Sequence, residues 1–151
     1  MQIRNVSFGV TAAIVTSMGL VVGLDAATAA KATILSGLLV VAIADNLTDS
    51  LSIHIYQESE QLESRTAFHA TVTNFGTRLG LSLSFVLLVA ILPVEVAVIA
   101  SIVWGSLLLA VLTCLVARAR KLPVVREVAK HLAVAAVVML ASKTIGSILV
   151  D

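Results

Sequence analysis

The stretch that decides the fold is residues 96–116, which read VAVIASIVWGSLLLAVLTCLV and contain no charged side chain. A helix needs about 20 apolar residues to cross the hydrocarbon core of a bilayer. A helix on the surface of a soluble protein would show a polar face at helical spacing, and this stretch shows none. It therefore predicts a transmembrane helix.

Other long apolar runs flank this stretch. They cover about residues 6–24, 32–56, 71–92 and 131–150. Membrane strands are about half as long and alternate between apolar and polar positions, so these runs predict helices. Only short connections separate them, among them a polar stretch from Gln57 to Arg65 and a turn at Pro93. We expect an all-α integral membrane bundle of five transmembrane helices, with residues 1–151 forming a single domain.

The composition supports this class and excludes others. Of the 151 residues, 59% are hydrophobic and only 13% are charged, whereas soluble domains carry about 25% charged residues. No basic stripe or nucleic-acid motif is visible, so the lipid bilayer is the expected partner and nucleic acid is not. The spans contain no pairing of a nucleophile with a base, so we do not expect an enzyme.

Positive charge is distributed unevenly over the connections. With five spans, one side of the membrane receives Arg4, Arg65, Arg118, Arg120, Lys121, Arg126 and Lys130. The other side receives Lys31 together with the acidic residues Asp25, Glu95 and Asp151. Because lysine and arginine accumulate on the cytoplasmic side, we expect a cytoplasmic N-terminus and an external C-terminus.

The second and third spans contain ionisable residues at membrane depth. Asp45 and Asp49 are four residues apart and therefore share a helix face. At about 1.5 Å per residue, Asp49 lies roughly 10 Å from the inner end of its span and Asp45 roughly 16 Å. Arg78 lies roughly 10 Å from the inner end of the third span. The aspartates and Arg78 are therefore expected at similar depth.

Two interpretations of these residues remain open. Intramembrane charges are expensive and are often functional. In a functional interpretation, Asp45 and Asp49 bind a divalent cation or a proton, and Asn46 and Thr48 supply further oxygen atoms. In a structural interpretation, Arg78 and Lys143 act as countercharges that neutralise the two acids and stabilise the bundle.

Two weaker sequence patterns also allow either a functional or a structural interpretation. Imidazole and carboxylate groups gather at the cytoplasmic mouth of the second and third spans: His54, Glu58, Glu60, Glu63 and His69. They form either a metal access route or merely solvated helix ends. Two Gly-x3-Gly pairs, Gly19 with Gly23 and Gly76 with Gly80, permit close helix approach. They serve either packing within the chain or a dimer contact.

The first span carries a family resemblance. Arg4, Phe8 and Gly9, followed by residues 14–24 (IVTSMGLVVGL), resemble the opening helix of the vacuolar iron transporter family. The Leu51-Ser52 pair, Pro93 and Gly146 also match that family in order. The resemblance implies five transmembrane helices, a homodimer, and proton-coupled export of ferrous and related divalent metals from the cytosol.

The chain departs from the family pattern where its metal ligands are expected. Ala12-Ala13 stands where the family has an Asp-Gly pair. Alignment on Leu51-Ser52 places Asp49 at a family glutamate and Asp45 at a metal-binding methionine, which implies a site richer in oxygen and therefore harder. The family's acidic insertion is reduced here to residues 57–66, so the cytoplasmic metal-collecting domain is expected to be absent.

These observations lead to a functional expectation with two alternatives. The chain is expected to be a homodimeric exporter of Fe²⁺ or Mn²⁺, with no permanently bound cofactor. The plasma membrane is favoured over a vacuolar or other organellar membrane. One alternative is a membrane scaffold or interaction protein that keeps the fold without transport. The other is a transporter of a different solute, which the same carboxylates could serve.

Overall fold

In the computed structural model, which describes residues 3–59 and 64–150, the chain folds into five helices and the described residues contain no strand. The helices are α1 (Ile3–Ala26), α2 (Lys31–Ser59), α3 (Ser64–Ile91), α4 (Val94–Ala119) and α5 (Val124–Ile148). The prediction of an all-α bundle is confirmed. Most helices extend beyond the predicted spans, because hydropathy marks only the apolar part of a helix that continues into polar ends.

Four of the described helices are long and apolar enough to cross a membrane. The qualifying segments are Gly9–Ala26, Lys31–Tyr56, Thr71–Ile91 and Val94–Ala119. Large apolar side chains cover the outside of the bundle; on α4, Ile99, Val103 and Leu115 are each more than 60% exposed. Such a surface suits contact with lipid and not with water. The chain is a multi-pass membrane protein.

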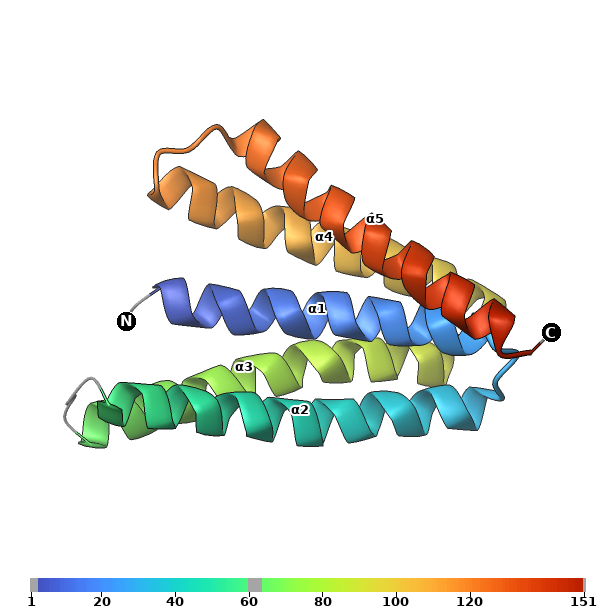
Figure 1. The fold of residues 1–151 in the computed structure, drawn as a ribbon, viewed down its shortest axis with the longest axis horizontal. Coiled ribbons are helices and arrows are strands. Elements are labelled where there is room, and N and C mark those ends of the chain that lie inside the picture. Colours follow the sequence, from blue (N-terminus) through green and yellow to red (C-terminus); the bar gives the residue numbers. More distant parts are fainter. Residues whose placement is uncertain (1–2, 60–63, 151) are drawn as a thin grey trace.

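Helix α1 is the centre of the bundle. It packs against each of the other four helices and supplies many of the fully buried apolar side chains, including Ile14, Met18 and Val21. Figure 1 shows α1 between a pair formed by α2 and α3 and a pair formed by α4 and α5. The two pairs therefore meet mainly through α1.

Helices α1 and α5 approach closely at their glycines. A Cβ atom added to Gly146 would overlap the carbonyl oxygen of Gly23, and one added to Gly19 would lie 3.0 Å from Ser142 Oγ. The first Gly-x3-Gly pair thus serves packing within the chain. Gly76 and Gly80 differ, since they are exposed on α3 and an added Cβ would meet nothing within 4 Å.

The two ends of the bundle differ in charge. The beginning of α1, the end of α2, the beginning of α3 and the α4–α5 connection lie at one end (Figure 1). We call this the basic end, since it carries Arg4, Arg65, Arg118, Arg120, Lys121, Arg126 and Lys130. At the opposite end Lys31 Nζ donates to the carbonyl oxygens of Ala90 and Leu92, 2.9 Å from each. Lys31 thereby ties the beginning of α2 to the C-terminus of α3.

Candidate functional site

Arg78 of α3 is the buried centre of a polar cluster between α2 and α3. Its side chain is only 1% exposed. Nη1 lies 2.7 Å from Asp49 Oδ2, and Nη2 lies 2.8 Å from Asp45 Oδ2. Nε donates to Asn46 Oδ1 at 2.8 Å. The expected pairing of the two acids with Arg78 is formed.

Helical periodicity explains how α2 supplies three partners to one guanidinium. Asp45 and Asp49 are one turn apart, and Asn46 lies beside them on the face that packs against α3. Asn46 is itself fixed in place, because its Nδ2 donates to the carbonyl oxygen of Ala42 at 2.6 Å. A guanidinium can donate five hydrogen bonds in a planar fork. The α2 face therefore matches three of the donors of Arg78.

Gly9 of α1 provides the space that Arg78 occupies. A Cβ atom at Gly9 would lie 2.7 Å from Asn74 Oδ1, 3.0 Å from Arg78 Nη1 and 3.1 Å from Arg78 Cδ. Sequence reasoning missed this contact. The only signal was a glycine at the basic end of an apolar helix, and a glycine in that setting has many explanations.

The cluster retains negative charge and unused oxygen atoms. Two ionised carboxylates and one guanidinium sum to a formal charge of −1. Both carboxylates bond through Oδ2, and within the described residues neither Oδ1 atom has a hydrogen-bond partner. The Asp45 side chain is 47% exposed and that of Asp49 is 23% exposed. The site is therefore open on the Asp45 side and closed around Arg78.

Asn74 adds one more oxygen to this cluster. Its Nδ2 donates to Asp49 Oδ2 at 3.3 Å. Its Oδ1 is buried and has no hydrogen-bond partner within the described residues. A buried acceptor without a donor is costly, so this atom favours the approach of a cation or a proton donor.

Two residues expected at the site are not brought into it. Thr48 is exposed on α2, and its hydroxyl donates to the carbonyl oxygen of Ala44 at 2.8 Å. Lys143 is exposed on α5 and forms no ion pair within the described part of the chain. The expected pairing of Lys143 with the acids is not formed, because α5 packs against α1 and α4 and not against α2.

A second group of polar contacts lies between the cluster and the basic end, around His54 of α2. His54 Nε2 lies 3.3 Å from Glu58 Oε1, and His54 Nδ1 lies 3.4 Å from Thr71 Oγ1 of α3. His69 is exposed, and its ring contacts Phe68. Glu60 and Glu63 lie outside the described residues. The structure thus joins His54 and Glu58 and does not bring His69 to them.

The chemistry of the cluster is that of paired carboxylates held by a cationic group. Within residues 3–59 and 64–150, no group of three or more His, Cys, Asp or Glu side chains is arranged to hold a metal ion. The two aspartates lie on one helix and share one countercharge. Such a pair can bind a cation or a proton if the guanidinium withdraws from one carboxylate.

Comparison of the chain with protein-family models, with curated proteins and with solved structures finds no match in any of the three.

Proposed function

We propose that the chain is a five-span transporter that moves a divalent cation, Fe²⁺ or Mn²⁺, out of the cytosol. In this proposal α5 is the fifth span, the basic end faces the cytoplasm, and the C-terminus is external. The distribution of lysine and arginine over the connections supports this orientation. Figure 1 supports the fifth span, because α5 runs from the basic end to the opposite end of the bundle.

The observation that carries the proposal is the incomplete neutralisation of Asp45 and Asp49. One guanidinium serves two carboxylates, and Asp45 remains 47% exposed. A net negative charge at membrane depth is unfavourable unless a cation or a proton compensates it. Carboxylate and amide oxygens suit hard and borderline divalent ions. A transported cation would supply the missing charge.

Arg78 would act as the countercharge of the empty site. When a cation approaches Asp45, the bond between Arg78 Nη2 and Asp45 Oδ2 can open while the bonds to Asn46 and Asp49 keep the guanidinium in place. The cation would reach this point from the basic end along the line of Glu58, His54 and Asp49. From Glu58 to Asp45 this route spans roughly 20 Å of helix.

A homodimer is part of the proposal. The resemblance of the first helix to the vacuolar iron transporter family implies a dimer. The exposed Gly76 and Gly80 support α3 as the contact, because nothing within 4 Å covers either position. In lipid, small residues at this spacing let two helices approach closely.

Cation uptake into proteoliposomes tests the transport function. Asp45→Asn and Asp49→Asn keep the shape of the side chain and remove its charge, so we expect each to lower Fe²⁺ or Mn²⁺ transport roughly tenfold or more. Asp25→Asn is the matched control, since Asp25 lies at the far end of α1, away from the cluster. If both cluster variants transport as well as the wild type, the site assignment is wrong.

A membrane scaffold without transport is the second candidate. The observation that favours it is that Arg78 already bonds to both aspartates, which can be a purely structural arrangement. Replacement of a buried ion pair by apolar residues is often tolerated, whereas removal of one member is not. A wild-type protein that folds and dimerises but moves no divalent ion into liposomes would favour this candidate.

A further inference from the structure

A second polar group lies at the basic end, between α1, α4 and α5, at the mouth of a cavity. The cavity has a volume of about 570 Å³, within the range of about 300–1,000 Å³ typical of small-molecule sites. Its walls are mainly apolar and include Val15 of α1, Leu112 and Val116 of α4, and Val134 of α5. The cavity is separate from the Arg78 cluster, which lies between α2 and α3.

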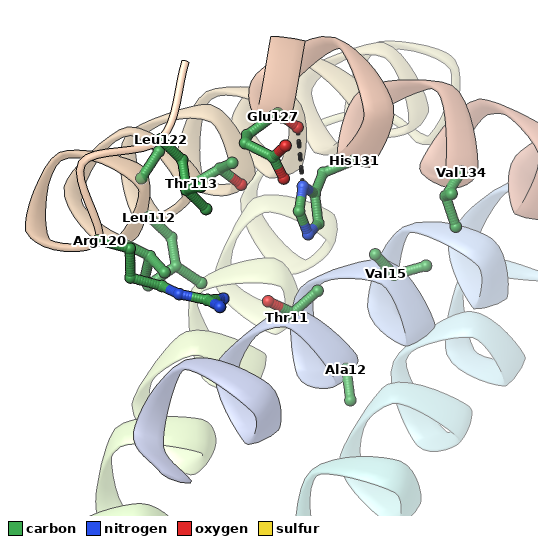
Figure 2. Close-up of a pocket in the computed structure, with 12 residues that line it drawn as sticks. Thr11, Ala12, Val15, Leu112, Thr113, Arg120, Leu122, Glu127, His131 and Val134 are labelled. Carbon is green, nitrogen blue, oxygen red and sulfur yellow. Dashed lines mark hydrogen bonds between the residues drawn. The ribbon is translucent and has the colours of Figure 1, made fainter. Parts of the chain in front are cut away.

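The mouth of this cavity carries an unneutralised cation. Figure 2 shows Arg120 and His131 reaching into the space above Thr11 of α1. Arg120 forms no ion pair within the described residues. The Nδ1–H of His131 donates to the backbone carbonyl oxygen of Glu127 at 2.8 Å, which leaves Nε2 for another partner.

The one acidic side chain at the mouth is already paired. Lys130 Nζ lies 2.7 Å from Glu127 Oε1. This hydrogen bond holds the pKa of the Glu127 carboxyl below its ordinary value. Glu127 precedes the apolar part of α5, so it lies outside the expected span. Since Lys130 neutralises Glu127, Arg120 is left free to bind an added anion.

The surroundings identify the anion by its chemistry. Arg118 at the end of α4, Lys121 in the connection and Arg126 at the beginning of α5 add positive charge nearby. Basic pockets between transmembrane helices on the cytoplasmic side, where we place the basic end, suit anionic lipid head groups. The apolar walls continue from the charged mouth toward the middle of the bundle. A ligand that fills both parts must have an anionic group joined to a hydrocarbon chain.

We propose that this cavity binds one anionic phospholipid, with its phosphate accepting from Arg120 and from Nε2–H of His131 in its doubly protonated form, and with an acyl chain between α1, α4 and α5. A free phosphate would use only the mouth, and a zwitterionic lipid would place its own cationic group beside the basic side chains around Arg120. The lipid would fill the space between α1 and the α4–α5 pair at the basic end. This binding is independent of the transport function.

Native mass spectrometry of the full-length protein, stripped of lipid in detergent, tests the proposal. We expect one equivalent of phosphatidylglycerol to bind roughly tenfold more tightly than phosphatidylcholine with the same acyl chains, because phosphatidylglycerol has a net negative charge, whereas the choline ammonium of phosphatidylcholine cancels the charge of its phosphate beside Arg120. Arg120→Gln should remove this preference. Arg118→Gln is the matched control, since it removes the same charge from α4 at a residue that does not line the cavity.

The apolar part is tested by filling it. Ala12→Phe places a ring in the cavity and should lower phosphatidylglycerol binding, whereas Ala136→Phe, on the exposed side of α5, should not. A thermal melt of each variant confirms folding, and His131→Gln replaces Arg120→Gln if the latter does not fold. Three results would each overturn the proposal. They are an equal loss of phosphatidylglycerol binding in Arg120→Gln and Arg118→Gln, unchanged phosphatidylglycerol binding in Ala12→Phe, and protection against thermal unfolding by inorganic phosphate that equals the protection by phosphatidylglycerol.

Discussion

Arg78 donates one hydrogen bond from each of its three nitrogen atoms, and all three acceptors belong to α2. A buried guanidinium without partners would be very costly in a membrane bundle. The cost is avoided here only while Asn46 and at least one aspartate remain in place. The same residues that allow the cluster to bind a cation therefore also hold α2 and α3 together.

This coupling predicts how substitutions combine. Asp49→Asn leaves Arg78 short of charge, and Arg78→Gln leaves two carboxylates without a countercharge, so we expect each to destabilise the protein, Arg78→Gln more strongly. The double variant should lose less stability than the two single variants lose together, by about 0.5–3 kcal/mol. Unfolding in detergent with increasing dodecyl sulfate measures this coupling. Losses that simply add would show that the two residues do not support each other.

At the scale of elements, small residues decide which helices approach closely and which stay apart. Gly23 and Gly146 bring α1 and α5 into backbone contact, while Gly76 and Gly80 leave open space outside α3. In the absence of water, helix association depends on packing and on interhelical hydrogen bonds. A methyl group therefore has opposite consequences on these two surfaces.

Alanine substitution of one glycine in each class tests this difference. Gly146→Ala places Cβ against the Gly23 carbonyl oxygen and, at 3.0 Å, against Ala26 Cβ; we expect a loss of about 1–3 kcal/mol from overpacking. Gly80→Ala meets nothing within 4 Å and should leave the monomer as stable as the wild type, or up to about 1 kcal/mol more stable. Thermal unfolding of the detergent-solubilised protein measures both.

Gly80→Ala also tests the proposed dimer. If α3 forms the contact, Gly80→Ala should weaken association while the monomer stays folded, as judged by light scattering in detergent. A dimer that is unaffected by Gly80→Ala would exclude this face of α3 as the contact.

At the scale of the whole molecule, hydropathy predicts the helices but not their neighbours. The matching depths of Asp49 and Arg78 could be counted along the chain because helical rise is constant, and the two residues do pair. The position of Lys143 could not be predicted in this way. A transmembrane helix is apolar toward both lipid and protein, so its sequence contains little information about which side packs on which partner.

The same limit explains what else escaped prediction. The contact between Gly9 and Arg78 and the cavity beside Arg120 each depend on how three helices are arranged around one another. Charge counts along the chain identify the basic connection that includes Arg120. They do not show that Arg120 lines an apolar cavity.

The number of membrane spans can be tested at the two ends of α5. Helix α5 has 25 residues, a length of roughly 37 Å, which exceeds the roughly 30 Å of hydrocarbon. Lys143 is one turn and a half from the last residue of α5, so its ammonium group can reach the nearby interface. We therefore expect Leu149, which is 77% exposed, to lie on the opposite side of the membrane from Lys121.

Single cysteines locate these positions. Cys114 is the one native cysteine, so Cys114→Ala provides a background for Lys121→Cys, Glu95→Cys and Leu149→Cys. In sealed cells, a membrane-impermeant maleimide should label Glu95→Cys and Leu149→Cys and should reach Lys121→Cys only after the membrane is opened. If Leu149→Cys is instead labelled only after the membrane is opened, as expected for Lys121→Cys, α5 does not cross the membrane. The bundle then has four spans, and the C-terminus lies on the same side of the membrane as the basic end.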